Sequence, residues 1–464
     1  MKKAEVLVIG AGPAGTIAAI RAATLGARTV LITSGPFGGM AANDGPIPVR
    51  TLAHAARLAR EARQLSRYGL TANNVSLEYD RLIRRAHEVV SEASAHSTFR
   101  GDVDRAGVEL IEHAGNVRFI DPHAVITPGG EVFRAKSVII CTGGVSRAIA
   151  APGSNFAVTP AAAFTLTSVP RSMIVIGAGA TGAQVASIFN AFGTKVHLFE
   201  SGDRIIKTED ADISAEVAAA FREDGITIYE RFGEIEAFSR TADGVTMRYG
   251  RGQTITAEVA VAAAGSIADT AALSVQTPGV ALTPRGFIAV NEYLQTSSKH
   301  IFAAGDVTGR WMLVPQSAYD GYVAGTNAVA REMIPADEDV NPIGSFTDPE
   351  YARVGATETQ ARASREVLVS VARYDETTRP IIDGRTRGFC KVIVDRDSRM
   401  IIGTHVVGER AVEVAQMAAI AMAAQMTIDD VMRVPLSFPT YANVFGRAVA
   451  YAVREPASSA PSPA

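Results

Sequence analysis

The fold of this chain is decided by Glu5-Val6-Leu7-Val8-Ile9-Gly10-Ala11-Gly12-Pro13-Ala14-Gly15, an apolar run that ends in closely spaced glycines. A helical stretch at 18–25 and a strand-like stretch at 28–32 follow it. The order strand, glycine turn, helix, strand predicts a βαβ unit that binds a dinucleotide. The pattern recurs in Met173-Ile174-Val175-Ile176-Gly177-Ala178-Gly179-Ala180-Thr181-Gly182, before a helix to Phe192 and a strand at 195–199. The chain is therefore predicted to be an α/β protein with two Rossmann-like nucleotide-binding domains.

Glycines in such a turn act by lacking side chains. The turn can be tight, the backbone can approach a pyrophosphate, and the phosphates can sit on the helix N-terminus, where free N–H groups and the dipole favour anions. We expect the first turn to contact its nucleotide through Gly10, Gly12, Pro13, Ala14 and Gly15. The second is expected to do so through Gly177, Gly179, Thr181 and Gly182.

An acidic residue at the end of the second strand usually binds the ribose hydroxyls of the nucleotide. Glu200 holds that place in the second unit, and it favours NADH because a carboxylate repels the 2′-phosphate of NADPH. Alternatively, Glu200 is a solvated residue at a strand end. In the first unit the place falls on Thr33, followed by Ser34, whose hydroxyls bond a ribose less strongly than a carboxylate does.

Composition excludes several classes of function. The formal net charge is −3, so there is no electrostatic case for nucleic-acid binding. We find no apolar run of the length that spans a membrane, and a cytoplasmic protein is the expectation. Two cysteines, Cys141 and Cys390, lie far apart in the sequence and predict neither a disulfide framework nor a metal site. We interpret both as inert buried residues.

The rest of the chain predicts further elements. Helices are expected at 52–66 and 79–94, and a β-rich stretch at 108–140. Beyond Pro342 we expect strands and two helices, with the methionines of 411–426 filling a core or an interface. The last residues, 456–464, contain only Pro, Ser and Ala and predict a disordered tail.

Four further motifs make the sequence resemble the pyridine nucleotide–disulfide oxidoreductases over residues 3–454. They are Cys141-Thr142-Gly143-Gly144, Ile301-Phe302-Ala303-Ala304-Gly305-Asp306, Met312-Leu313 and Phe346-Thr347-Asp348-Pro349-Glu350. The resemblance implies an FAD domain (1–150 and 266–340), an NAD domain (151–265) and a C-terminal α+β dimerisation domain (341–455) that forms a homodimer. It also implies cofactor contacts at Gly39, Met40, Arg50, Gly115, Thr142, Gly143, Gly265, Asp306, Met312 and Leu313.

The residues of disulfide chemistry are missing. Where the family has its two redox cysteines, this chain has Ala41 and Pro46. Where the family has the acid–base His and Glu that the partner subunit supplies, it has Phe438 and Asn443. Disulfide exchange needs a thiolate, and protonation of a leaving thiolate needs a group that titrates near neutral pH. We therefore expect no disulfide reductase.

Three hypotheses remain for the function. The first is an NADH:acceptor oxidoreductase that passes electrons from FAD to a quinone-like or aromatic acceptor. Its pocket would be lined by Ala41, Ala42, Pro46 and the partner's Phe438 and Tyr441, with Asn443 and Asp44 as polar points. The second is a flavin dehydrogenase or oxidase for one metabolite, and the third a non-catalytic FAD-binding scaffold or sensor. As alternatives, Tyr441 only packs, Asn443 only caps and Asp44 only forms a turn.

A last pair of substitutions concerns charge beside the flavin. The resemblance places Arg50 where the family has a lysine, and Gln184 where it has that lysine's glutamate partner. If both lie there, the charge near the flavin rises by about one unit and raises its reduction potential. Alternatively, Arg50 turns away to a surface carboxylate such as Asp44.

Overall fold

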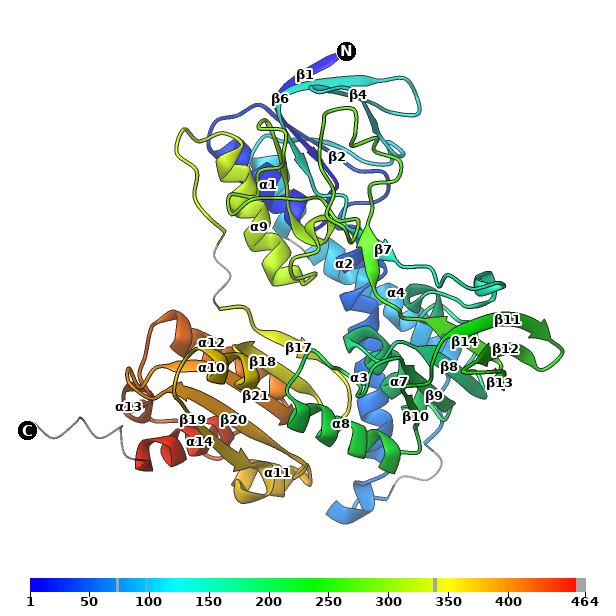
Figure 1. Cartoon of the computed structure of the whole chain (residues 1–464), viewed down its shortest axis with the longest axis vertical. Helices are drawn as coiled ribbons and strands as arrows, with labels where there is room; N and C mark the ends of the chain where they lie inside the picture. Colours follow the sequence, from blue (N-terminus) through cyan, green and yellow to red (C-terminus); the bar gives the residue numbers. More distant parts are fainter. Residues whose placement is uncertain (72–74, 97, 337–339, 456–464) are drawn as a thin grey trace, which may run out of the picture. The chain divides into compact units, whose positions relative to one another are not determined.

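A computed structural model of the chain describes residues 1–71, 75–96, 98–336 and 340–455, so the predicted tail at 456–464 lies outside the described residues. By its internal contacts the chain divides into two compact units (Figure 1). The first unit comprises Met1–Leu52, Glu78–Arg147 and Gly265–Asp337. The second unit comprises Ala53–Leu77, Ala148–Ala264 and Glu338–Ala464.

A sheet in the order β3-β2-β1-β6-β5-β4, with β16 paired to β6, is the centre of the first unit. Its strands are β1 (Lys2–Ile9), β2 (Thr29–Ile32), β3 (Glu109–Ile111), β4 (Arg118–Asp121), β5 (Ala124–Ile126), β6 (Val132–Ile140) and β16 (Ile301–Ala303). Neighbouring strands in the series β3, β2, β1, β6 and β16 pair in parallel. Strands β4 and β5 form an antiparallel meander that pairs with β6. A short pair, β7 (Gly144–Ser146) and β15 (Ser266–Ala268), lies apart from this sheet. The predicted first βαβ unit and β-rich stretch are confirmed.

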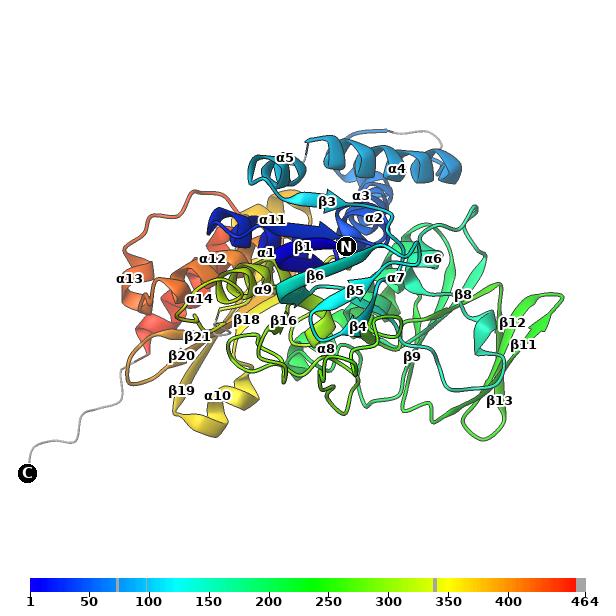
Figure 2. The same ribbon diagram turned by 90° about the horizontal axis from the view of Figure 1, so that it is seen from above.

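Two helices of the first unit pack tightly against each other (Figures 1 and 2). They are α1 (Pro13–Thr24) and α9 (Val314–Asn327). A Cβ atom on Gly321 of α9 would lie 2.2 Å from the carbonyl oxygen of Ala14, and one on Gly325 would lie 2.5 Å from that of Ala18. Only glycine allows this approach. Further helices of this unit are α2 (Gly39–Asn43), α4 (Tyr79–His96) and α5 (Thr98–Arg105).

Helix α3 (Pro46–Ala62) begins six residues before the predicted start at Leu52. Pro46 and Pro48 read as helix breakers in sequence, but the first turn of a helix tolerates proline because its N–H groups have no partner there. A 3₁₀ turn at Leu65–Tyr68 replaces the predicted last residues of the helix. The N-terminal part of α3 belongs to the first unit and the remainder to the second.

In the second unit, β10-β9-β8-β14 form a parallel sheet. Its strands are β8 (Ser172–Ile176), β9 (Lys195–Glu200), β10 (Thr227–Glu230) and β14 (Val259–Ala262), with helices α6 (Pro160–Ala163), α7 (Ala180–Ala191) and α8 (Ala211–Glu223). An antiparallel sheet of β11 (Ile235–Thr241), β12 (Gly244–Tyr249) and β13 (Gln253–Ala257) packs an aromatic cluster against it. The second predicted βαβ unit is thus confirmed.

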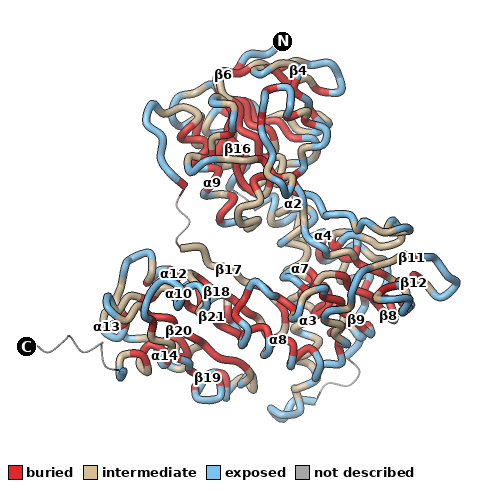
Figure 3. The backbone as a smooth tube through the Cα atoms, viewed as in Figure 1, coloured by how far each residue is buried: buried red, intermediate tan, exposed pale blue. Residues whose placement is uncertain are grey.

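A five-stranded antiparallel sheet in the order β17-β18-β21-β20-β19 follows in the same unit. Its strands are β17 (Ile343–Ser345), β18 (Tyr351–Gly355), β19 (Val367–Arg373), β20 (Gly388–Asp395) and β21 (Ile401–Gly408). Helices α12 (Ala411–Ala423) and α14 (Ala442–Arg454) bury one face of it, where β20 is buried along most of its length (Figure 3). Three methionines of this region, Met417, Met422 and Met426, pack against that core, as expected.

The prediction of two helices in this region was wrong. The described residues of 340–455 also contain α10 (Glu358–Ser364), α11 (Thr378–Asp383) and α13 (Ile428–Met432). Each is too short for helical periodicity to be read over a window of 11–18 residues. Capping boxes at Thr357 and Thr427 start two of them. Among the described residues, no helix is both long and apolar enough to cross a membrane.

Candidate active site

The first glycine turn has the geometry that the sequence predicts. Gly12 caps the N-terminus of α1, and Pro13 is the first residue of that helix. A Cβ atom on Gly10 would lie 2.1 Å from the carbonyl oxygen of Cys141, and one on Gly15 would lie 1.7 Å from that of Gly10. Side chains are therefore excluded where strand and helix meet, and the N–H groups of the first helical turn remain open to an anion.

Segments far apart in the sequence converge on this turn within the first unit. A Cβ atom on Gly39 would lie 2.9 Å from the Cα atom of Gly12. One on Gly305, the neighbour of Asp306, would lie 2.9 Å from the Cβ atom of Ala14. One on Gly144 would lie 3.2 Å from Met312 Cε and 3.7 Å from Asp306 Cβ. Gly39, Asp306 and Met312, which the resemblance predicts to contact the cofactor, thus lie close to the first glycine turn or to Gly144.

Thr142 Oγ1 and Trp311 Nε1 are buried polar atoms of the first unit that have no hydrogen-bond partner among the described residues. Buried polar groups are almost always bonded, so these atoms suit a ligand that is itself polar. Asp306 adds a carboxyl whose pKa is raised by burial, although the Ser317 hydroxyl donates to it at 3.2 Å. The donors, the acceptor and the glycine cradle fit FAD. Sequence reasoning missed Trp311, although the chain's single tryptophan precedes Met312-Leu313.

Backbone hydrogen bonds join the loop after β2 to the loop after β3. His113 N donates to Gly35 O at 3.2 Å, and Ala114 N donates to Thr33 O at 3.0 Å. Thr33 is buried, whereas Ser34 is exposed. Gly115 has a φ of +71°, and a Cβ atom there would lie 2.9 Å from Pro128 Cγ. These loops lie at the carboxyl edge of the parallel strands, where α/β sheets bind their ligands.

The second glycine turn is equally tight, since a Cβ atom on Gly182 would lie 1.8 Å from the carbonyl oxygen of Gly177. Glu200 ends β9, and only 7% of it is exposed. Its carboxylate accepts from Ala178 N at 3.1 Å and from Gly202 N at 2.8 Å. The alternative of a solvated Glu200 was therefore wrong. The remaining lone pairs of this anchored carboxylate can accept ribose hydroxyls.

The C-terminal half of α3 is held by the second unit. Arg60 donates to Ser187 O at 2.7 Å and pairs with Asp348 at 3.3 Å, and Arg63 donates to Ala191 O at 2.9 Å. Sequence reasoning missed both arginines, because helical spacing alone does not say what a cation contacts. On α7, Gln184 donates to Ala180 O at 3.3 Å. Its proximity to Arg50, a partly buried residue of the first unit, stays a prediction.

The residues at the redox-cysteine positions carry no reactive group. Ala41 lies in α2, and Pro46 is the first residue of α3. Both cysteines are free thiols and are buried elsewhere, Cys141 beside the first glycine turn and Cys390 in the core of the C-terminal sheet. Burial raises the pKa of each thiol far above its ordinary value. This confirms that both cysteines are buried, as predicted.

Among the predicted site residues near the C-terminus, Phe438 is exposed, whereas Tyr441 and Asn443 form hydrogen bonds within the chain. Phe438 is 73% exposed. The Tyr441 hydroxyl donates to Asp383 at 2.8 Å, and its ring lies 6.1 Å from that of Tyr374. Asn443 Oδ1 accepts from Thr440 N at 2.9 Å. The alternatives of packing for Tyr441 and capping for Asn443 therefore describe contacts that these side chains do make.

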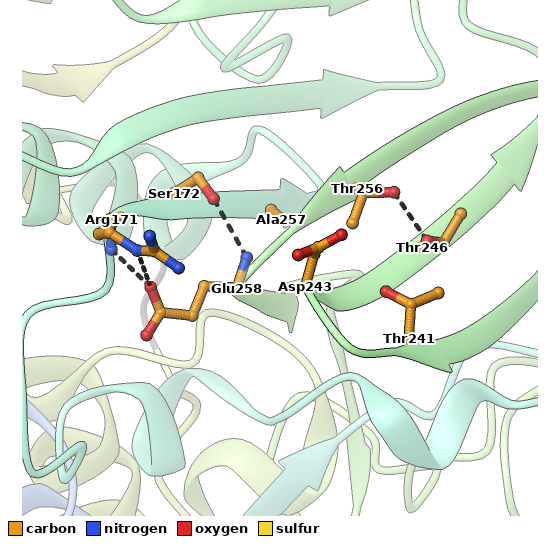
Figure 4. Close-up of a pocket in the computed structure, with 8 residues that line it drawn as sticks. All are labelled: Arg171, Ser172, Thr241, Asp243, Thr246, Thr256, Ala257 and Glu258. Carbon is orange, nitrogen blue, oxygen red and sulfur yellow. Dashed lines mark hydrogen bonds and ion pairs between the residues drawn. The ribbon is translucent and has the colours of Figure 1, made fainter.

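A hollow of about 490 Å³ lies on the second unit, away from its glycine turn. Arg171 and Ser172 line it at the start of β8, with Glu258 just before β14 (Figure 4). Glu258 N donates to Ser172 Oγ at 3.1 Å, and the Glu258 carboxylate pairs with Arg171 at 3.5 Å. Ligands of parallel α/β sheets bind at the opposite, carboxyl edge, so we do not place the active site here.

Comparison with known proteins decides the family. Residues 4–321 match the pyridine nucleotide-disulphide oxidoreductases, and residues 341–449 match the dimerisation domain of that family. The chain belongs to the pyridine nucleotide-disulphide oxidoreductase family. It is 29% identical to dihydrolipoyl dehydrogenase of Bacillus subtilis, with 96% of this chain and 97% of the relative covered. It is 30% identical to a soluble pyridine nucleotide transhydrogenase of Mycobacterium tuberculosis, with 97% of each covered.

Solved structures agree on the fold. LpdA from Mycobacterium tuberculosis superimposes with a TM-score of 0.87 at 24% identity, over 97% of this chain and 99% of that one. Members of the oxidoreductase family are flavin-dependent enzymes that use FAD and NAD(P)H. The expected fold, the family and the class of enzyme are thereby confirmed.

Proposed function

We propose that the protein is an NADH:acceptor oxidoreductase in which FAD passes electrons directly to a small organic acceptor. The observation that carries this proposal is the absence of sulfur at Ala41 and Pro46, together with the burial of Cys141 and Cys390 elsewhere. Bound FAD would accept hydride from NADH and deliver the electrons onward. The chain's own residues would bind and orient both partners and exclude water.

The proposed acceptor is flat and apolar, such as a quinone or an aromatic compound. Alanine and proline at the former sulfur positions leave an apolar face, and Phe438 is an exposed aromatic ring that a homodimer could supply to it. Apolar pockets with few polar groups suit such ligands. Because Tyr441 and Asn443 already bond within their own chain, Phe438 is the stronger candidate among the three.

Electron counting tests the proposal. In an anaerobic titration, one equivalent of NADH per FAD is expected to bleach the flavin fully, since no disulfide takes up a second pair of electrons. A long-wavelength charge-transfer band between thiolate and flavin is expected to be absent. A need for two equivalents, or the appearance of that band, would place a redox-active sulfur beside the flavin and refute the proposal.

A second candidate is electron transfer to another pyridine nucleotide. It is supported by the relative named soluble pyridine nucleotide transhydrogenase, which matches over 97% of this chain. The same reduced protein distinguishes the two functions. Rapid reoxidation by NADP⁺ but not by quinones would favour the transhydrogenase, and the reverse would favour the organic acceptor.

Glu200 is proposed to select NADH. We expect Glu200→Gln to raise the KM for NADH about tenfold, because hydrogen bonds to a charged group contribute roughly 1.5–3 kcal/mol. The limiting rate of flavin reduction should change little, since the ribose is remote from the hydride. The matched control is Glu230→Gln, at the end of the neighbouring strand and in register with Glu200. Steady-state and stopped-flow kinetics with NADH and NADPH measure both effects, and an unchanged KM would contradict the assignment.

A further inference from the structure

The first unit lacks the usual acid for the adenosine ribose of FAD. The residue after β2 is Thr33, which is 7% exposed. A neutral hydroxyl forms weaker hydrogen bonds than a carboxylate does. The glycine cradle and the unpartnered Thr142 and Trp311 atoms nevertheless fit FAD. A carboxylate from another position would restore the missing interaction.

Strand register identifies that position. In the parallel pair β2 and β3, Ile32 lies opposite Ile111, and Thr33 N donates to Ile111 O at 2.9 Å. The next residues in the same register are Thr33 and Glu112. Side chains at one register position of neighbouring strands point to the same face, and the strands lie about 4.8 Å apart. The Glu112 carboxylate therefore lies at the end of β3, the strand next to the position of the missing acid at Thr33.

The Glu112 side chain turns toward the loop that follows Thr33. Its Oε1 atom accepts from Phe37 N at 2.8 Å. Arg100 of α5 also bonds to the carboxylate, and its guanidinium lies 5.7 Å from the centre of the Phe37 ring. The carboxylate is thus fixed from two sides, with 21% of the side chain exposed.

The fixed carboxylate keeps both its charge and capacity for further bonds. Burial by itself would raise the pKa of Glu112, but Arg100 and the Phe37 N–H outweigh burial, so the pKa lies below its ordinary value. An ionised carboxylate offers about four acceptor sites. Three hydrogen bonds on the protein, one from Phe37 N and two from Arg100, do not fill all of them, and a ribose hydroxyl is a suitable partner for the rest.

We propose that Glu112, in place of a residue after β2, binds a hydroxyl of the adenosine ribose of FAD. Arg100 and Phe37 are the residues that position it. The proposal needs only FAD and does not depend on the identity of the acceptor.

Ligand titration of the apoprotein tests this assignment. Dissociation constants are measured by flavin fluorescence for FAD and for an FAD analogue whose adenosine lacks both ribose hydroxyls. We expect Glu112→Gln to weaken FAD about ten- to hundredfold, the range for hydrogen bonds to a charged group, and to leave the analogue unchanged. Glu112→Asp, which withdraws the carboxylate by one methylene, is expected to show the same selectivity.

The control is Glu109→Gln, on β3 three residues earlier, whose carboxylate pairs with Lys2 at an exposed position. It should affect neither ligand, and circular dichroism of each apoprotein checks that the fold is kept. Equal weakening of FAD and the analogue would mean that Glu112 only holds the Phe37 loop. Unchanged FAD binding in both Glu112 variants would also overturn the proposal.

Discussion

With FAD bound and NADH saturating, lipoamide, glutathione disulfide and Hg(II) are expected to be reduced no faster than in a blank without protein. Reduction of a disulfide requires a thiolate that attacks sulfur. The two cysteines cannot supply one, since both are buried and burial raises their pKa far above its ordinary value. Phe438, moreover, cannot contribute the roughly 10²–10⁴-fold that a positioned acid or base provides.

Thiol labelling is the second measurement for this prediction. A thiol reagent such as dithionitrobenzoate should react with neither cysteine in the folded protein and with both after unfolding in guanidinium. Turnover of a quinone with NADH by the same preparation is the positive control for an active flavin. Lipoamide turnover above the blank, or a thiol that reacts in the folded state, would contradict the assignment of Ala41 and Pro46 to the redox positions.

Replacing Glu350 by Gln is expected to stabilise the protein at pH 8 by up to about 3 kcal/mol. Burial, followed by repulsion from Glu409 and Glu413, raises the pKa of Glu350 from its ordinary 4.5 to about 7. Arg57 and Arg410 oppose these effects only in part. Arg57 bonds directly to the Glu409 carboxylate at 2.6 Å, as does Arg385 at 3.0 Å. The nearby arginines thus neutralise the charge of Glu409 more than that of Glu350.

The pH dependence has a definite sign. A carboxyl whose pKa is higher in the folded state binds more protons there, so folding becomes less favourable as the pH rises. The stabilising contribution of Glu350 to the folded state is fully present below about pH 4.5 and is lost as the pH rises through about 7. Melting temperatures between pH 5 and 8 should therefore diverge, with Glu350→Gln increasingly above the unmodified protein. Glu366→Gln, at an exposed position, is the control, and parallel curves for all three proteins would refute this account.

Sequence patterns located the nucleotide-binding parts well for a physical reason. The glycines at Gly10, Gly15 and Gly182 meet backbone atoms that no side chain could approach, so the turn can only be built from that residue type. Glu200 could be predicted as a ribose ligand because it is the last residue of its strand, a fixed place in the nucleotide-binding pattern. The short helices of the C-terminal region were missed, since five to seven residues carry too little periodicity.

The contacts of side chains on different elements could not be found in this way. Phe438 and Tyr441 are close neighbours in the sequence, yet the first is exposed and the second donates its hydroxyl to Asp383. Similarly, no pattern along α3 indicates that Arg60 bonds to Ser187. Such contacts depend on which elements pack together.

By itself the sequence determined the two nucleotide folds, the family and the loss of the redox sulfurs, because each depends on residue types at short, fixed spacings. Tertiary structure alone decided the surroundings of the individual carboxylates. It places Glu112 beside Thr33 across the β2–β3 ladder, with Phe37 and Arg100 as its donors. It also leaves Glu350 buried next to an arginine-bound Glu409. These partners are distant in the chain, and the charge and reach of a carboxylate depend on the neighbours that folding brings to it.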